Sequence, residues 1–159
     1  MTTLKILVLS DSHQTMRYMV EAVEKERPDH VIHLGDHTRD AEDLRRQFPM
    51  LPILMVRGNC DFDYDHREQA LAAFGEIRIL AVHGHRYGVK SSLLRYELAA
   101  RENGVQVALF GHTHHAVCEY YNGLWLLNPG SCGYSSRPTY GMIEIQGSEV
   151  SCCIKSFDE

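Results

Sequence analysis

The sequence predicts an α/β protein in which two β-sheets pack face to face and helices cover their outer sides. Two observations carry this prediction. Up to His114, strand-length runs rich in Val, Ile and Leu alternate with stretches of helical periodicity, a pattern typical of strand–helix–strand units. After His114 the chain shows short strand-like runs between turn residues, which is typical of antiparallel sheet. Two mixed β-sheets flanked by helices accommodate both patterns.

Five strands are predicted in the first part of the chain. They cover residues 4–9, 30–34, 53–56, 77–82 and 105–110. Each run is rich in aliphatic residues, as expected for buried parallel strands. The interval before the fourth strand has no clear helical period, so we predict a short edge strand there, at residues 70–74, in a hairpin with the strand that follows.

Three helices are predicted, over residues 16–26, 39–48 and 91–103, because apolar side chains recur there at helical spacing. The residues at helical spacing are Met16, Met19, Val20 and Val23 in the first helix, Ala41, Leu44 and Phe48 in the second, and Leu94, Leu98 and Arg101 in the third. We expect Ser91 to cap the third helix and Asn103-Gly104 to end it.

The last part of the chain predicts four short strands, at residues 116–121, 124–127, 140–145 and 149–154. Asn122-Gly123 and Gly147-Ser148 are turn-forming pairs between them. We found no repeat, low-complexity segment or linker, so we predict a single domain over residues 1–159.

The composition excludes several classes of protein. With 44% hydrophobic and 23% charged residues, the chain is not of the disordered class. Its net charge of −5 disfavours binding to long nucleic acids. No apolar run approaches the ~20 residues of a membrane span, and the start does not resemble a signal peptide. The five cysteines are odd in number and form no CxxC pair, so we predict a reducing, cytoplasmic location.

Polar side chains of the metal-binding types follow the predicted strands. The candidates are Asp11, His13, Asp36, Asn59, His83, His112 and His114. Carboxyl ends of strands form the ligand-binding edge of open α/β sheets, so these side chains should converge. Asp11 and His13 are two apart and would point the same way in an extended segment, as would His112 and His114.

Carboxylate, imidazole and amide ligands suit Mn, Fe, Co, Ni or Zn. Seven ligands exceed what one ion usually takes from protein, so two ions sharing a carboxylate fit better. Two adjacent divalent ions indicate hydrolytic phosphoryl transfer.

The ordered motifs D-S-H, G-D, G-N-C-D, H-G-H and G-H-T-H resemble those of the calcineurin-like metallophosphoesterases. The resemblance runs from Lys5 to at least Ser131, and is greatest to the small bacterial and archaeal phosphodiesterases (the YfcE-like subgroup). It implies a four-layer α/β/β/α sandwich that hydrolyses a small phosphodiester with a metal-bridging hydroxide, and Mn²⁺ is the favoured ion. It assigns Asp11, His13, Asp36 and His114 to one ion, and Asp36, Asn59, His83 and His112 to the other.

Two residues depart from the pattern of most of this superfamily. Cys60 stands where most members have a histidine that acts on the leaving group or the phosphate. Because a thiol replaces imidazolium poorly, we expect a preference for activated diesters. Gln14 replaces the glycine that usually follows D-x-H. We take Cys60 and His85 as candidate catalytic residues, although Cys60 could be a small filler and His85 could have a packing role.

The remaining polar residues receive simpler interpretations. His37 and His115 are expected to point away from the ions, and His30, His33 and His66 to be structural or on the surface. Asp61 is interpreted as a turn residue, and residues 128–131 as a turn that supports the site. Arg57, Arg86 and Arg137 could contact a substrate phosphate, against the default of solvated surface arginines.

Three further functions stay open at this point. A retromer subunit of the same fold, with altered ligand positions, is a protein-binding scaffold without catalysis, but here all seven expected ligands are present. The same set of ligands would also suit a nuclease acting on short substrates or a phosphomonoesterase. Assembly into a homo-oligomer is possible.

Overall fold

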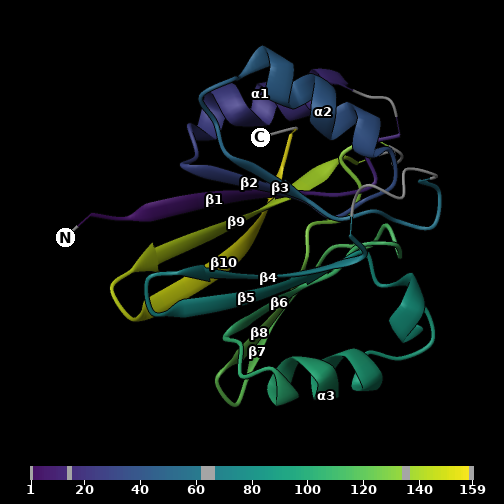
Figure 1. Cartoon of the computed structure of the whole chain (residues 1–159), viewed down its shortest axis with the longest axis vertical. Coiled ribbons are helices and arrows are strands. Elements are labelled where there is room, and N and C mark those ends of the chain that lie inside the picture. Colours follow the sequence, from purple (N-terminus) through teal and green to yellow (C-terminus); the bar gives the residue numbers. More distant parts are fainter. Residues whose placement is uncertain (1, 14–15, 62–66, 134–136, 158–159) are drawn as a thin grey trace.

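The computed structural model describes residues 2–13, 16–61, 67–133 and 137–157. Two five-stranded sheets pack face to face. Helices α1 (Met16–Glu26) and α2 (Thr38–Gln47) cover the outer face of the first sheet, and α3 (Leu94–Glu102) covers the outer face of the second (Figure 1). The predicted arrangement of two mixed sheets with helices outside is therefore confirmed.

The first sheet has the strand order β10-β9-β1-β2-β3. Its strands are β1 (Leu4–Leu9), β2 (His30–His33), β3 (Ile53–Met55), β9 (Thr139–Gln146) and β10 (Glu149–Ser156). The strands β1, β2 and β3 are parallel and are joined through α1 and α2, whereas β9 runs antiparallel to β1. The last two of the four late strands predicted from turn residues thus extend the sheet begun at the N-terminus.

The second sheet has the order β4-β5-β6-β8-β7. Its strands are β4 (Gln69–Phe74), β5 (Ile77–Val82), β6 (Val107–Leu109), β7 (Val117–Tyr121) and β8 (Leu124–Asn128). Here β5, β6 and β8 are parallel. The predicted edge strand is β4, which pairs antiparallel with β5, so that prediction is confirmed. A short 3-10 helix, η1 (His85–Tyr87), follows β5.

Side-chain alternation along the strands divides the core between the layers. On β1, Ile6 and Val8 face the second sheet, while Leu7 and Leu9 pack under α1 and α2. These four side chains are fully buried. Burial of each such aliphatic side chain contributes about 1.5–3 kcal/mol, so the continuous apolar runs of the sequence serve two interfaces at once.

The buried face of α3 differs from the predicted one. Leu94 and Leu98 are 60% and 57% exposed, and the buried residues are Tyr96 and Ala100. The Tyr96 hydroxyl donates to the Leu109 carbonyl, and its ring packs near Phe110. A large aromatic side chain gains more from burial than a leucine does, and this contact sets the rotation of the helix.

The ends of α3 were predicted with mixed success. The helix begins at Leu94, and the Ser92 hydroxyl, not Ser91, accepts a hydrogen bond from the Leu94 amide at 3.2 Å. The predicted end is confirmed, because Asn103 is the C-cap residue of the helix and Gly104, which follows it, adopts a φ of 65°. In the described residues, no helix has the length and apolar character that a bilayer span requires.

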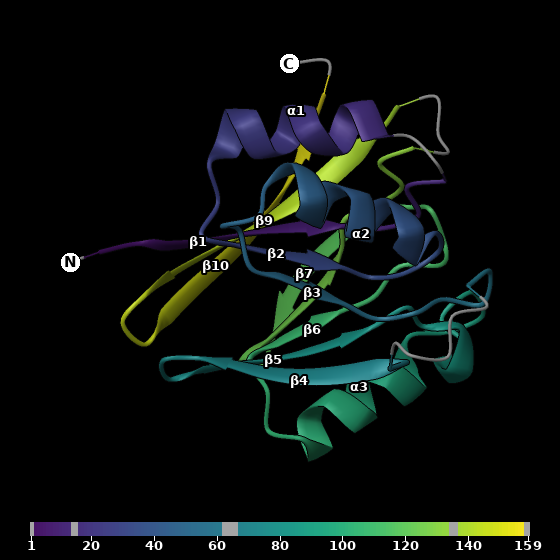
Figure 2. The same ribbon diagram turned by 45° about the horizontal axis from the view of Figure 1, so that its top comes forward.

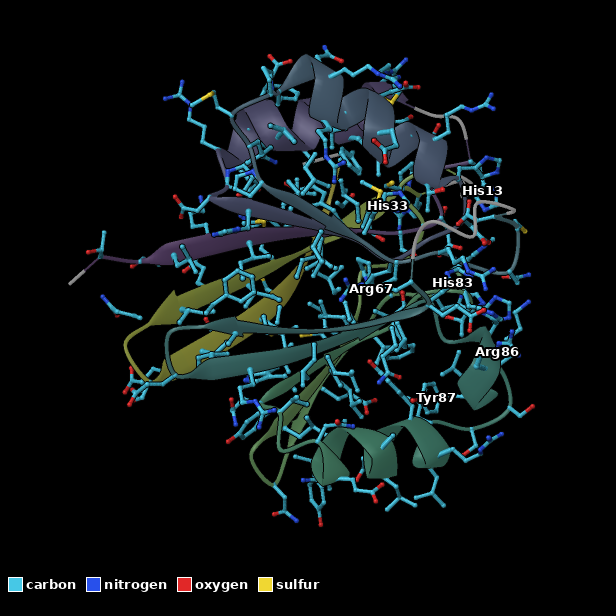
Figure 3. The ribbon with its side chains drawn as sticks, in the orientation of Figure 1. His13, His33, Arg67, His83, Arg86 and Tyr87 are labelled. Carbon is cyan, nitrogen blue, oxygen red and sulfur yellow. The ribbon has the colours of Figure 1, made fainter. Side chains whose placement is uncertain are left out.

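Parallel strands in both sheets bring their carboxyl ends to one edge of the molecule. The strands β1, β2 and β3 deliver their following loops to this edge from the first sheet, and β5 and β6 do so from the second (Figure 2). His13, His83 and Arg86 lie at this edge in Figure 3.

Leu44→Ala and Leu98→Ala test which helix faces are buried. Leu44 is fully buried under α2, so its truncation should lower the free energy of unfolding by about 2–5 kcal/mol. Leu98 is the matched control, because it is a helical leucine on the exposed side of α3, and its truncation should change stability by under about 0.5 kcal/mol. Chemical denaturation measures both. Equal losses for the two variants would contradict the assignment of the α3 face.

Candidate metal centre

Both sheets contribute candidate ligands to the shared edge. Asp11 and His13 follow β1, Asp36 follows β2, and Asn59 lies in the loop after β3. From the second sheet, His83 follows β5, and His112 and His114 follow β6.

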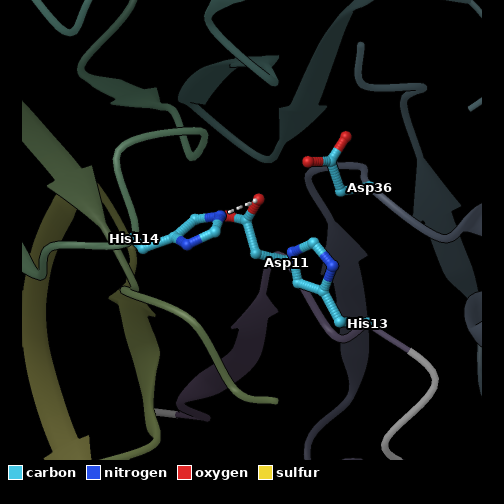
Figure 4. Close-up of side chains that lie close together, drawn as sticks. All are labelled: Asp11, His13, Asp36 and His114. Atoms are coloured by element: carbon cyan, nitrogen blue, oxygen red, sulfur yellow. Dashed lines mark ion pairs between the residues drawn. The ribbon is translucent and has the colours of Figure 1, made fainter. Parts of the chain in front are cut away.

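Four of these side chains form one compact group. Asp11, His13, Asp36 and His114 each place a ligand atom within 4.8 Å of the others (Figure 4). The His114 Nε2 lies 3.2 Å from the Asp11 Oδ1. This group has the composition that the resemblance assigned to one ion.

The chemistry of this group fits a cation. Asp11 is fully buried, and its Oδ1 has no well-directed hydrogen bond within the described residues. A buried carboxylate oxygen that lacks a well-directed hydrogen bond is costly unless a positive charge compensates it. Two carboxylates and two imidazoles together supply the oxygen and nitrogen donors that divalent transition ions prefer.

His83 and His112 form a second group beside the first. The His83 Nε2 lies 3.5 Å from the Asp36 Oδ2 and 3.2 Å from the His112 Nδ1. The other ring nitrogen of His83 lies 2.9 Å from the Leu34 carbonyl. A carbonyl can only accept, so Nδ1 carries a proton and Nε2 faces the carboxylate, an orientation typical of metal-binding histidines.

Asn59 is the predicted ligand least defined by the structure, because it is exposed. The loop that carries it nevertheless touches the site, since the amide of the adjacent Cys60 donates to the Asp36 Oδ1 at 3.0 Å. Ligation by Asn59 stays a prediction.

The backbone at the site adopts a conformation that the sequence argument did not expect. Five candidate ligands have positive φ: Asp11 (53°), His13 (45°), Asp36 (56°), His112 (68°) and His114 (64°). Each such residue costs on the order of 1–3 kcal/mol. The premise that these motifs are extended is therefore wrong, and left-handed turns bring the paired side chains together.

The same turns explain an error about a neighbouring histidine. His37 was expected to point away, but its φ is 74° and its ring centroid lies 4.8 Å from that of His13. His115 is exposed. Alternation of side chains holds only for extended backbone, and so it did not apply to His37.

The loop at residues 128–131 supports the site, as predicted. The Ser131 hydroxyl donates to the Asp11 carbonyl at 2.8 Å. The side-chain nitrogen Nδ2 of Asn128 donates to the Gly111 carbonyl at 3.2 Å and to the Thr113 hydroxyl at 2.9 Å. These bonds connect the turns that follow β1 and β6.

Glycine at position 58 permits a close approach of two loops. A Cβ there would overlap the Asp36 Oδ1 and lie 2.9 Å from the His83 ring. Close packing is the clearest reason for glycine at this position, since Gly58 does not have positive φ.

Asp61 organises the site in a way that the sequence analysis missed. Its Oδ1 accepts from the amides of His37 (2.7 Å) and Thr38 (2.9 Å), and its Oδ2 accepts from the Gly58 amide at 2.8 Å. It therefore caps α2 from a distant loop. The missing capping residue before Thr38 was a signal that another side chain must satisfy those amides.

Burial and neighbouring charges shift the pKa values of the site in opposite directions. Burial lowers the pKa of His83, but the contact with Asp36 and the charge of Asp11 outweigh it and leave the pKa raised. The ion pair with Asp11 raises the pKa of His114. Burial, together with the charge of His83, lowers the pKa of His112 to about 4.

The carboxylate between the two groups is held ionised. Burial acts to raise the pKa of Asp36, but the contact with His83 and the Cys60 amide lower it well below its usual range. Asp36 is therefore an anion over the whole physiological pH range, as a bridging ligand requires.

The candidate catalytic residues lie beside the groups of ligands. His85 places its ring centroid 5.6 Å from that of His83, and its Nδ1 is buried without a hydrogen-bond partner in the described ranges. Cys60 is exposed. Partial burial of its thiol and the charge of Asp36 nevertheless raise the pKa of this group, which disfavours a thiolate. The catalytic roles of both residues stay predictions.

The three candidate phosphate-binding arginines differ in their surroundings. Arg57 and Arg86 both bind the Glu68 carboxylate, at 2.7 Å and 3.0 Å. Arg137 is exposed. Gln14 and His66, which also carried sequence predictions, lie outside the described residues.

Known proteins that resemble this chain agree with the geometry of the site. The profile of the calcineurin-like phosphoesterase superfamily domain matches residues 4–148. The chain therefore belongs to this superfamily, and both the predicted resemblance and the predicted fold class are confirmed. The predicted class of enzyme, a metal-dependent phosphoric ester hydrolase, is that of this family.

Two curated relatives match most of the chain. The probable metallophosphoesterase YsnB of Bacillus subtilis is 37% identical over 132 residues, which is 80% of this chain and 75% of YsnB. The phosphodiesterase MJ0936 of Methanocaldococcus jannaschii is 26% identical over 170 residues, which is 92% of this chain and 96% of MJ0936.

Solved structures share the fold. A predicted phosphoesterase from Streptococcus pneumoniae superposes with a TM-score of 0.80 at 27% identity, over 99% of this chain and 92% of the other. Vps29 of Entamoeba histolytica, crystallised with Zn²⁺, gives a TM-score of 0.77 at 22% identity, over 97% and 99% of the two chains. At that identity the second likeness concerns the fold alone.

The raised pKa values predict how metal affinity depends on pH. Metal binding requires neutral His83 and His114, whose pKa values lie above the ordinary 6.5. As the pH falls, protons occupy these nitrogens, so affinity should begin to fall above pH 6.5 and continue to fall below it. Calorimetric titration with Mn²⁺ between about pH 5.5 and about pH 8.5 measures this. Constant affinity over that range would contradict the assignment. The control is His30→Gln, at the far end of β2, whose Mn²⁺ affinity should depend on pH as that of the wild type does.

Gly58→Ala tests the close packing of the loops. The new methyl group must displace the Asp36 carboxylate, so we expect metal affinity to fall by about 10–100-fold. Gly141→Ala is the control, because a Cβ there would meet its nearest side chain at 3.3 Å, which requires only a small adjustment. Unchanged Mn²⁺ affinity in Gly58→Ala, measured by calorimetry, would exclude this role.

Proposed function

We propose that this protein is a binuclear metal-dependent phosphodiesterase that acts on small substrates. One observation carries the proposal: Asp36 belongs to the group formed with Asp11, His13 and His114, and its Oδ2 also lies 3.5 Å from the His83 Nε2. A carboxylate in that place can be shared by two ions.

Each ion would take its ligands from both sheets. Asp11, His13, Asp36 and His114 would hold one ion, and Asp36, His83, His112 and Asn59 would hold the other. When bound, two such ions lower the pKa of water and neutralise charge on a phosphoryl group. We propose Mn²⁺ as the ion, and Fe, Co, Ni and Zn also suit these donors.

The chain's own residues contribute position and charge. The Cys60 amide and the Asp61 side chain fix the loop that carries Asn59 against the Asp36 turn. His85 lies next to His83 at the edge of the site, where its imidazole could exchange a proton with a leaving group or bind the substrate. The thiol of Cys60, with its raised pKa, would give a poor leaving group little help.

Three features support a small diester as the substrate. A relative of this chain is named a phosphodiesterase. The replacement of the usual histidine by Cys60 favours diesters with good leaving groups. The net charge of −5 disfavours long polyanions. The cytoplasmic location and assembly into a homo-oligomer stay predictions.

Asp36→Ala should abolish this activity, because it removes the ligand that both ions share. We expect turnover of bis(p-nitrophenyl) phosphate with added Mn²⁺ to fall by more than about 100-fold. Asp43→Ala is the matched control, since Asp43 lies on the exposed side of α2 and pairs with Arg46. Near wild-type turnover by Asp36→Ala would refute the assignment.

A screen of the metal ions against three substrates separates the candidate activities. The activated diester, p-nitrophenyl phosphate and a short oligonucleotide distinguish a diesterase, a monoesterase and a nuclease. If the dialysed protein takes up no added metal and cleaves none of the three substrates, the result would favour the function of a protein-binding scaffold.

A further inference from the structure

A buried polar group lies behind the candidate metal centre and outside the ligand set. It consists of Ser12, His33 and Asp40, which come from the loop after β1, the end of β2 and the first turn of α2. Ser12 and His33 are fully buried and Asp40 is 4% exposed. His33 was interpreted as structural or surface, and Figure 3 labels it inside the molecule.

The hydrogen bonds of this group run in one direction. The Gly35 amide donates to the His33 Nδ1 at 3.2 Å, so that nitrogen must carry a lone pair. The His33 Nε2 then carries the proton and donates to the Ser12 Oγ at 3.0 Å. The Ser12 hydroxyl in turn donates to the Asp40 Oδ2 at 2.7 Å.

The partners of His33 adjoin the strained turns of the site. Ser12 stands between Asp11 and His13, which both have positive φ, and Gly35 immediately precedes Asp36, which has positive φ as well. Such conformations persist only where the surroundings over-determine them. One imidazole thus binds both turns, from two neighbouring strands.

We propose that His33 is a positioning residue that holds the Asp11–His13 turn through Ser12 and the Asp36 turn through Gly35. This inference rests on the proposed metal centre. Its neutral imidazole serves as a fixed spacer with one acceptor and one donor, and Asp40 fixes the Ser12 hydroxyl so that this group stays an acceptor toward His33. Burial lowers the pKa of His33, in agreement with the neutral form that the bond directions require.

Three substitutions separate the two connections. Ser12→Ala removes the hydroxyl between Asp11 and His13. His33→Asn keeps an acceptor near the Nδ1 position and loses the donor toward Ser12, whereas His33→Gln keeps a donor near the Nε2 position and loses the acceptor toward Gly35. The control is His30→Asn at the other end of β2, where the ring packs on Phe74 at a centroid distance of 4.9 Å.

Co²⁺ titration of the full-length metal-free protein, followed by visible absorption, measures both affinity and ligand geometry. Ser12→Ala and His33→Asn should weaken Co²⁺ binding by about 10–100-fold and change the absorption band. His33→Gln should lose less affinity than His33→Asn, and His30→Asn should stay within about threefold of wild type. Thermal melting of the metal-free variants reports separately on folding.

Each contrary outcome is decisive as well. Wild-type affinity and absorption in Ser12→Ala would overturn the inference, even if its melting temperature falls, because a merely structural role predicts that result. If His33→Asn does not fold, Ser12→Ala, which removes one oxygen atom, still decides. An equal loss in His30→Asn would also overturn it. A wild-type protein that takes up no Co²⁺ would overturn the proposed function and this inference together.

Discussion

The structure depends on the packing of two carboxylates, Asp11 and Asp36, among histidines at the edge where both sheets end. The two residues are 0% and 3% exposed. Like charges at such short range, removed from water, are unfavourable without a compensating positive charge. In the absence of ions the histidines supply part of this charge, which is why contact with the carboxylates raises the pKa values of His83 and His114. The chemistry of the site therefore suits cations, independently of its likeness to known proteins.

The backbone around these carboxylates is strained, and the strain is held by residues that bind no ion. Five candidate ligands have positive φ, and each turn is tied to another element. Ser131 holds the first turn, Asp61 connects the second to the loop after β3, and Asn128 holds the loop after β6. Strained conformations that are fixed from several sides are common where a site must be preorganised. The same buried bonds would keep the ligands in place as ions enter and leave.

Membership of the superfamily establishes the fold, whereas the chemistry of the site is the evidence for function. The superfamily assignment rests on residues 4–148, but the same fold occurs in Vps29, and a fold does not by itself define a function. The distinguishing evidence is the site: the ligand types, the distances between them and the position of Asp36 between two groups. Pairing of Arg57 and Arg86 with Glu68 further shows that part of the positive charge near this edge is already engaged.

The sequence by itself determined the strands, two of the three buried helix faces, the edge hairpin and the set of candidate ligands, because these depend on periodicity and on residues adjacent in the chain. Only the tertiary structure decided the face of α3, the contact of His37 with His13, and the roles of Asp61 and His33. Tyr96 reaches Leu109, Asp61 reaches His37, and His33 reaches Ser12. The partner in each case lies 13 or more positions away along the chain, so its identity follows from how the layers pack and not from any local pattern.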